Sequence, residues 1–310
     1  MSQVHHNELQ QINTITEFHR LRGLPKPLHP LVSLVDYSLV QHTPDNNRMS
    51  WVQQFYTIGL KRDVCGKFRY GQQEYDFDEG LMSFIAPGQV FSMEVYDYGE
   101  APPPSGWLLL VHPDLFWNTP LAKTIKQYAF FGYNVNESLF LSEKEELIVL
   151  GILQNIEREY RENIDKFSQS IIVSQIETLL NYADRFYQRQ FITRKITNHH
   201  LLNRIEEFLS GYIGNDALLM QGLPTVKSIA DELNVSPDYL TSVLRSLTGL
   251  TTQQHIQNKL IEKAKEKLST TNLSISEIAY GLGFEHPQSF SKLFKAKTNQ
   301  SPLAFRASFN

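Results

Sequence analysis

The sequence predicts a multidomain α+β protein in which a β-rich N-terminal domain with a helical pair precedes an all-α C-terminal domain. Three observations predict this class. Residues 31–111 hold short β-rich runs separated by turn residues, residues 142–190 hold two long helical patterns, and residues 226–299 contain one helical pattern twice. At 310 residues the chain is long enough to bury two separate cores.

The N-terminal domain is predicted from runs rich in aliphatic, β-branched and aromatic residues. These runs cover residues 31–40, 51–60, 67–70, 81–85, 90–96 and 107–111. Turn signals rich in Gly, Pro, Asp and Asn separate them at residues 43–46, 78–80, 86–88 and 102–104. Several short strands at such spacing predict a β-sandwich or barrel, which we assign to residues 1–140.

Two helices are predicted after the strands, in a segment assigned to residues 141–190. The first covers residues 142–163 and opens with Ser142 and Glu145 at capping-box spacing. The second covers residues 166–190, with apolar side chains along one stripe: Ile172, Ile176, Leu179, Leu180, Ala183, Phe186 and Tyr187. The stripe suits either packing inside the chain or a dimer interface. The polar residues 191–198 are the predicted linker.

The C-terminal domain is predicted from an internal repeat, residues 226–249 and residues 275–299. When the copies are aligned, apolar positions and prolines coincide: Ile229 with Ile278, Ala230 with Ala279, Leu233 with Leu282, Pro237 with Pro287, Leu240 with Phe290 and Leu244 with Phe294. Each copy predicts a short helix, a tight turn and a second helix opened by proline. That is a helix-turn-helix, the unit that places its second helix in the DNA major groove.

The ends of these helices are marked by local chemistry. Ser236 is a good N-cap, Gly249 and Asn299 suit C-terminal caps, and Ser274 with Glu277 forms a capping box. A long helix over residues 252–269 joins the copies and spans roughly 25 Å. Such a rod can hold two second helices about one DNA turn (~34 Å) apart. A last short helix is predicted over residues 302–309.

Residues 274–306, SISEIAYGLGFEHPQSFSKLFKAKTNQSPLAFR, carry the most specific pattern of the chain. They contain I-A-x-x-x-G-F, then P-x-x-F-x-x-x-F-K, then S-P-x-x-F-R. This pattern resembles the DNA-binding domain of the AraC/XylS transcription regulators, and the resemblance covers residues 199–310. It implies a seven-helix domain with two helix-turn-helices, double-stranded DNA and RNA polymerase as partners, and activation rather than repression.

The repeat indicates which residues face DNA, because both second helices should expose the same face. In the first copy that face carries Asp238, Thr241, Ser242 and Arg245, and in the second Gln288, Ser291, Lys292 and Lys295. Gln288 suits adenine and Lys292 suits guanine, whereas Arg245 and Lys295 suit phosphates. The alternative is that these residues form a solvated polar face.

Charge differs between the two halves of this domain. Residues 199–250 hold three basic and six acidic residues, a net charge of −3, whereas residues 251–310 hold eight basic and four acidic residues, a net charge of +4. We therefore expect the second motif to supply most of the electrostatic attraction for DNA. The first motif is expected to read less sequence, or to read it through methyl and hydroxyl contacts.

Residues 74–95, EYDFDEGLMSFIAPGQVFSMEV, resemble the cupin-like jelly-roll barrel that precedes the DNA-binding domain in many AraC-like regulators. The resemblance implies a pocket for a small-molecule effector, with aromatic candidates Trp51, Phe55, Phe68, Tyr70, Phe84 and Trp107. The alternative is that these rings are only core. No metal or other cofactor is expected, because no His occurs between His42 and His112 and Phe91 stands where a ligand His often follows P-G-Q-V.

Other classes of protein are disfavoured. The net charge of −4 argues against indiscriminate polyanion binding, and the one cysteine, Cys65, excludes an internal disulfide framework. Residues 1–10 lack a secretory pattern, no run approaches the ~18 apolar residues of a membrane span, and no enzyme motif is present. The carboxylate clusters of residues 143–146 and 157–162 are interpreted as solvated helix faces.

These observations predict a cytoplasmic, homodimeric, sequence-specific transcription regulator that is not an enzyme and has no membrane partner. Its N-terminal domain would sense a small molecule or mediate dimerisation. Two alternatives stay open: a cupin-type protein that binds or isomerises a small molecule and keeps a vestigial DNA domain, and a regulator whose barrel is only a dimer scaffold.

Overall fold

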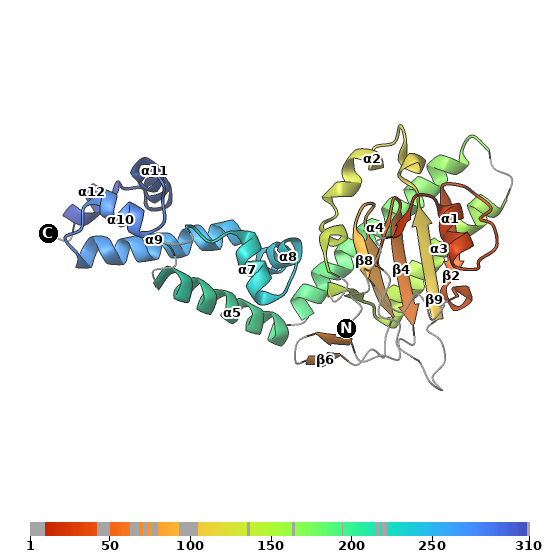
Figure 1. The fold of residues 1–310 in the computed structure, drawn as a ribbon, viewed down its shortest axis with the longest axis horizontal. Coiled ribbons are helices and arrows are strands. Elements are labelled where there is room, and N and C mark those ends of the chain that lie inside the picture. The colour runs from red at the N-terminus through yellow and green to blue at the C-terminus, as the bar shows by residue number, and fades with distance from the viewer. Residues whose placement is uncertain are drawn as a thin grey trace, which may run out of the picture. The chain divides into compact units, whose positions relative to one another are not determined.

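The computed structural model describes residues 10–41, 50–62, 68–70, 73–75, 80–92, 105–134, 137–162, 165–193, 195–214, 218 and 222–308. It divides into two compact units, Met1–Gln190 and Phe191–Asn310. The first unit combines strands and helices, and the second is helical (Figure 1). Cys65 lies outside the described residues.

The described strands of the first unit form three sheets. The largest is antiparallel and has the order β10 (Leu139–Phe140), β7 (Leu81–Ile85), β4 (Tyr56–Arg62), β9 (Ser105–Val111) and β2 (Val32–Asp36). A second sheet contains β1 (Gln10–Ile12), β3 (Ser50–Gln53) and β8 (Val90–Ser92), and a third contains β5 (Phe68–Tyr70) and β6 (Gln73–Tyr75). The described strands do not close into a barrel, so the cupin-like jelly roll stays a prediction.

The large sheet has two different faces, because successive side chains of a strand point to opposite sides. One face meets aromatic rings of the helical side: the Tyr56 and Phe131 ring centroids lie 5.0 Å apart, and those of Phe84 and Tyr187 6.2 Å apart. On the other face, Leu108 and Leu110 join the buried cluster of the N-terminal segment.

Helices α3 (Glu143–Arg161) and α4 (Ser168–Thr193) confirm the predicted helical pair and cover one face of the large sheet (Figure 1). The Tyr160 hydroxyl accepts a hydrogen bond from the Leu34 backbone N–H at 3.0 Å, which ties α3 to β2. In the predicted apolar stripe of α4, Ile176, Leu179 and Leu180 are fully buried. The stripe is therefore used for packing inside the chain.

Several boundaries differ from the prediction for local reasons. The run predicted as one strand over residues 51–60 is two strands, β3 and β4, with Phe55 buried between them. The run over residues 31–40 becomes strand β2 followed by the 3-10 helix η1 (Tyr37–Leu39), because the Asp36 carboxylate accepts from the Ser38 N–H at 2.9 Å and turns the chain. Residues 93–96 of another predicted run lie outside the described residues.

The linker assigned to residues 191–198 stays a prediction, and the part of it that the structure describes is helical. Helix α4 continues to Thr193, and helix α5 (Lys195–Gly214) begins two residues later. The segment contains neither Gly nor Pro, so no residue in it opposes helix formation strongly.

Some elements were not predicted. Helix α1 (Ile15–Leu21) begins at Thr14, whose hydroxyl accepts from the Glu17 N–H at 3.1 Å. Its Phe18 ring packs against Phe55 at 6.0 Å between centroids. Short helices follow β9, namely η3 (Pro113–Phe116), α2 (Leu121–Thr124), η4 (Ile125–Gln127) and η5 (Ala129–Gly132).

The second unit has the predicted helices, namely α7 (Val226–Leu233), α8 (Pro237–Thr248), α9 (Thr252–Thr270), α10 (Ile275–Gly281), α11 (Pro287–Thr298) and α12 (Pro302–Ala307). Within this unit, α7 and α8 pack at one end of α9 and α10, α11 and α12 at the other (Figure 1). One buried cluster, which includes Ile229, Leu244, Ile256, Ala279 and Phe294, runs through both motifs. The two copies therefore share a single core.

Candidate nucleic-acid interface and N-terminal cavity

The turns of the two motifs have the same backbone geometry. Asn234 (φ 56°) and Gly283 (φ 77°) occupy equivalent positions, and both are left-handed. One residue later, the Val235 N–H donates to the Ala230 carbonyl at 3.0 Å, and the Phe284 N–H donates to the Ala279 carbonyl at 3.1 Å. These bonds close the first helix of each motif and set the direction in which the second helix leaves.

The second helices end alike. Gly249 and Asn299 are left-handed caps whose N–H groups donate to the Arg245 and Lys295 carbonyls, each at 2.9 Å. They begin differently: the Ser236 hydroxyl accepts from the Tyr239 N–H at 3.2 Å, whereas His286 makes no side-chain cap bond. The predicted caps Ser236, Gly249 and Asn299 are thus confirmed, and the N-cap position of α11 lacks a side-chain cap bond.

The apolar faces of the second helices are buried in both motifs, which leaves their polar faces outward. In α8 the fully buried residues include Leu240 and Leu244, and in α11 they are Phe290 and Phe294. The second motif is aromatic: the ring centroids of Phe290 and Phe294 lie 5.8 Å apart, and those of Phe294 and Phe305 5.5 Å apart. Such ring pairs add stability beyond the area that they bury.

The four predicted contact residues of the first motif all lie on α8, but they differ in exposure to solvent. Asp238 and Arg245 are exposed, whereas Thr241 and Ser242 are half-buried. The Thr241 hydroxyl lies 3.1 Å from that of the buried Thr252 at the start of α9. Thr241 is therefore tied to the connecting helix, and its methyl group and the remaining hydrogen-bonding capacity of its hydroxyl are left for another contact.

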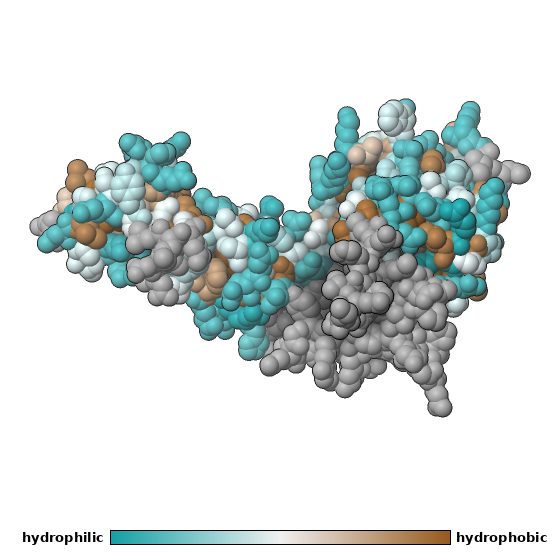
Figure 2. Space-filling view, in the orientation of Figure 1, coloured by the Kyte–Doolittle hydropathy of each residue, from teal (hydrophilic) through white to brown (hydrophobic). Residues whose placement is uncertain are grey.

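The four predicted contact residues of the second motif are more accessible. Gln288, Lys292 and Lys295 are exposed on α11 and Ser291 is half-buried. Among the described residues, none pairs with the two lysines, and α11 contains no acidic residue. Figure 2 shows hydrophilic side chains gathered over the position of α11. This face can donate hydrogen bonds and attract an anion.

Three other basic residues of the segment 251–308 contact groups of the same unit: Lys259, Lys263 and Arg306. On α9, Lys259 lies 3.5 Å from Glu262 and Lys263 lies 2.8 Å from Glu266. Arg306 is half-buried, and its Nε donates to the Leu268 carbonyl at 3.3 Å, which joins α12 to the end of α9. The arginine of the closing S-P-x-x-F-R pattern therefore has a structural contact that sequence reasoning missed.

The six aromatic candidates of the N-terminal domain do not converge on one site. Trp51 lines a cavity, whereas Phe84 packs on Phe130 at 4.4 Å between ring centroids, on the helical side of the sheet. Phe55 is buried core, and Trp107 is half-buried on β9, paired with Asp36 and Leu60. For Phe68 and Tyr70 the structure describes only the backbone, in β5.

The cavity lies between α1, η1 and the large sheet and has a volume of about 60 Å³. Its described lining residues are Phe18, Arg22, Tyr37, Val40, Trp51, Gln53, Thr57, Lys61, Ser83, Ile85 and Leu108. Apart from Trp51, sequence reasoning missed these residues. The signal on β4 was the alternation of Thr57, Gly59 and Lys61, which breaks the apolar pattern of the strand.

Two cations line this cavity. Arg22 is only 7% exposed, and its guanidinium carbon lies 4.6 Å from the Trp51 ring centroid and 5.9 Å from that of Phe18. The half-buried Lys61 has its Nζ 4.6 Å from the Tyr37 ring centroid. No carboxylate is among the described residues of the lining.

Because no described lining residue is a carboxylate, no negative charge in the lining balances the charges of Arg22 and Lys61. Burial lowers the pKa of Arg22, an effect that Tyr37 opposes, and burial lowers the pKa of Lys61 to about 8. A desolvated cation over an aromatic ring gains about 2 kcal/mol. Moving an ion out of water costs several kcal/mol, so the rings do not offset the burial of Arg22.

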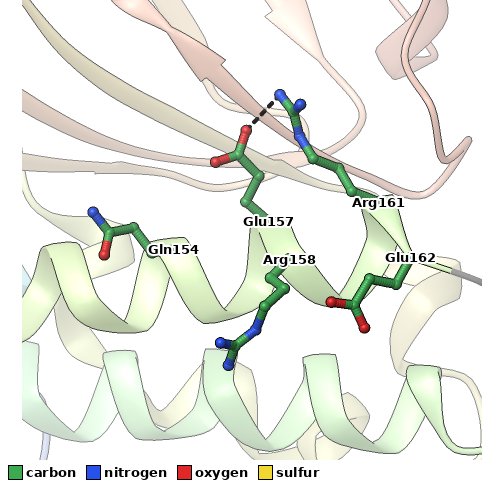
Figure 3. Close-up of a pocket in the computed structure, with 5 residues that line it drawn as sticks. All are labelled: Gln154, Glu157, Arg158, Arg161 and Glu162. Atoms are coloured by element: carbon green, nitrogen blue, oxygen red, sulfur yellow. Dashed lines mark ion pairs between the residues drawn. The ribbon is translucent and has the colours of Figure 1, made fainter.

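A second hollow, of about 420 Å³, lies on the solvent side of α3 (Figure 3). It is lined by Gln154, Glu157, Arg158, Arg161 and Glu162. Glu157 and Arg161 form an ion pair at 2.7 Å, one helical turn apart, and Arg158 donates to Asn155 at 3.1 Å. The carboxylates are paired or exposed to water, as a solvated helix face requires.

The described residues lack the features of two other kinds of site. They contain no group of three or more His, Cys, Asp or Glu residues placed to hold a metal ion. No described helix combines the length and apolar character needed to cross a membrane.

Comparison with known proteins identifies the class of the second unit. Residues 229–308 match the family model described as a helix-turn-helix domain. The chain is 30% identical over 160 residues to the uncharacterized HTH-type transcriptional regulator YfiF of Bacillus subtilis, covering 52% of this chain and 48% of that protein. It thus spans about half the length of this relative.

Two further similarities extend over other parts of the chain. The chain is 22% identical over 261 residues to the arabinose operon regulatory protein of Salmonella typhimurium, covering 81% of this chain and 83% of that protein. A solved structure, the C-terminal domain of the response regulator AraT of Geobacillus stearothermophilus, is 29% identical and covers 35% of this chain and 84% of that chain, with a TM-score of 0.31. Residues 229–308 of the C-terminal unit thus match a helix-turn-helix domain, and the chain is similar to transcription regulators that include the arabinose operon regulatory protein.

Proposed function

We propose that the protein is a sequence-specific, DNA-binding transcription regulator of AraC type. The observation that carries this proposal is the duplicated turn. Asn234 and Gly283 give both motifs one backbone geometry, and each second helix buries its apolar face and turns a polar face outward. A duplicated scaffold with two outward polar helices suits two successive major grooves.

The spacing of the motifs supports the same proposal. Helix α9 has 19 residues, which corresponds to a length of about 28 Å. This approaches the ~34 Å of one DNA turn, so both second helices can address one side of the duplex. In this proposal α11 reads bases through Gln288 and Lys292 and contacts phosphate through Lys295. Helix α8 contributes Arg245 and weaker contacts from Thr241 and Ser242. Its Asp238 repels phosphate unless it accepts a hydrogen bond from a cytosine amino group.

The N-terminal unit is proposed to be a cupin-like domain that senses a small molecule or mediates dimerisation. The cavity beneath α1 supports sensing, and the 62% exposed Leu147 on α3 offers apolar surface to a second copy. An effector would act by shifting the population of domain arrangements, and so the spacing of the DNA-binding units in a homodimer. Activation through RNA polymerase, a cytoplasmic location and the absence of enzyme activity complete the proposal.

A footprint of the purified full chain on DNA upstream of its own and neighbouring genes tests this function. We expect protection over about two helical turns per subunit, weakened by Lys292→Ala. Lys144→Ala, which removes an exposed lysine from α3, should leave the footprint unchanged. A folded protein that protects no DNA at low salt, with or without candidate effectors, contradicts the proposal.

The N-terminal cavity also favours a second candidate: a cupin-type protein that binds or isomerises a small molecule, with a vestigial DNA domain. Its lining includes two cations, Arg22 and Lys61, whose charge suits an anionic ligand. Saturable turnover of a small molecule by the full chain, together with no salt-dependent DNA affinity, would favour this candidate over the regulator.

A further inference from the structure

We propose that the N-terminal cavity binds a small organic carboxylate of about two to three carbons, held between Arg22 and Lys61. The inference rests on the proposed sensing function, because it names the class of effector, but the binding site stands on its own observations.

The first observation is the pair of cations. Arg22 follows α1 and Lys61 belongs to β4, so two segments far apart in sequence bring positive charge to one cavity of about 60 Å³. Rings fix both groups: Trp51 lies under the guanidinium and Tyr37 lies under the ammonium. Neither cation has a carboxylate partner within the described part of the chain. A bound anion would supply the missing charge.

The hydroxyl groups of the lining point to an acceptor as ligand. Gln53 Nε2 donates to the Thr57 hydroxyl at 2.6 Å and to the Phe55 carbonyl at 3.3 Å. Because Thr57 Oγ1 already accepts this bond, its own proton is left to donate, and it has no acceptor among the described residues. The Ser83 hydroxyl, which also lines the cavity, has none either. A carboxylate accepts such bonds through either oxygen.

The size and the apolar part of the lining restrict the anion further. At ~10–15 Å³ for each water-sized position, the cavity has room for roughly four to six non-hydrogen atoms. Val40, Ile85 and Leu108 offer no donor, so a fully polar anion such as phosphate would leave oxygen atoms unpaired against them. A carboxylate with a short carbon chain meets both the cations and the apolar wall.

Titration calorimetry of the full chain tests the proposal with acetate, propionate, propionamide and inorganic phosphate. Propionamide has the shape of propionate without its charge. We expect propionate or acetate to bind, and propionamide and phosphate to bind at least about tenfold more weakly. Equal binding of propionamide would overturn the charge argument. Binding of phosphate alone would show that the cavity is an inorganic-anion site. No heat of binding with any of the four compounds would contradict the proposal that the cavity is a binding site.

Variants assign the binding to these two residues. Arg22→Gln and Lys61→Met should each raise the Kd for propionate by more than about tenfold, because each leaves the ligand charge less compensated. Arg20→Gln removes an exposed charge from α1, two residues before Arg22, and should leave the Kd unchanged. Lys61→Arg keeps the charge and should retain more affinity than Lys61→Met. Unchanged affinity in folded Arg22→Gln and Lys61→Met would contradict the assignment.

The result of the carboxylate titration can be separated from the result of the DNA footprint. The footprint is first measured on the same protein preparation with no carboxylate ligand added. Carboxylate binding without a footprint would leave this inference standing and remove the regulator. A footprint without carboxylate binding would do the reverse.

Discussion

The two helix-turn-helix motifs share one backbone geometry but carry different residues on their exposed faces. Their turns pass through left-handed residues at equivalent positions, and their second helices end on equivalent caps. On the outward face, however, α8 presents one exposed arginine and one exposed aspartate, whereas α11 presents Gln288, Lys292 and Lys295. The scaffold is thus set by buried and turn residues, and the exposed residues differ without disturbing it. Equal geometry therefore does not imply an equal contribution to DNA binding.

The largest expected difference between the motifs concerns their cores. Phe294→Ala should destabilise the second unit by about 3–5 kcal/mol, because it removes a fully buried ring that contacts two other rings. The equivalent Leu244→Ala removes fewer atoms and should cost about 2–4 kcal/mol. Urea unfolding of the full chain, followed by the helical signal, measures both. Lys295→Ala on the exposed face of α11 is the control. A larger loss for Leu244→Ala would show that the core depends chiefly on the first motif.

The next comparison separates the two reading faces. Lys292→Ala should weaken binding to the footprinted site by about 1–3 kcal/mol and relax the preference at one base pair. Asp238→Asn should instead tighten binding several-fold, since it removes an exposed negative charge that would repel phosphate.

Binding titrations at two salt concentrations, with single-base variants of the site, check both outcomes. Weaker binding of Asp238→Asn, confined to a site with cytosine at one position, would show that Asp238 accepts a base contact and that α8 reads sequence.

The turn offers a smaller test of the shared backbone. Alanine at either left-handed position should cost about 1–2 kcal/mol. Gly283→Ala should cost more than Asn234→Ala, because a Cβ at Gly283 would lie 3.2 Å from the Leu218 carbonyl oxygen. Asn234→Gly should be neutral or stabilising, since glycine adopts this conformation freely. Thermal unfolding ranks the three variants. No cost for Asn234→Ala would mean that the first turn does not depend on its left-handed residue.

The sequence predicted the second unit more closely than the first for a physical reason. The limits of α8, for example, are set within a few residues by Ser236, Pro237 and Gly249, whose capping chemistry is visible in the sequence. The cavity of the first unit has no such local cause. Arg22 and Lys61 meet only after α1 packs on the sheet, and α1 is too short for its period to be decisive. Likewise, neither Gly nor Pro marks the break between β3 and β4.

The smallest expected effect is an acid sensitivity confined to the first motif. His255 Nε2 lies 2.8 Å from the Thr248 hydroxyl, and burial lowers the pKa of His255, although Glu206 opposes the shift. The equivalent Thr298 has no histidine partner among the described residues; its hydroxyl donates to the Phe294 carbonyl. Because the folded pKa lies below the unfolded value of about 6.5, the unfolded chain binds more protons as the pH falls through this range. Stability is therefore full above about pH 6.5 and is lost as the pH falls toward the folded pKa. Melting temperatures of the native chain and His255→Gln, measured from pH 7.5 to about 5, should converge at the acid end if this is so. A constant difference at every pH would show that His255 contributes by packing alone, and that the two motifs respond to acid alike.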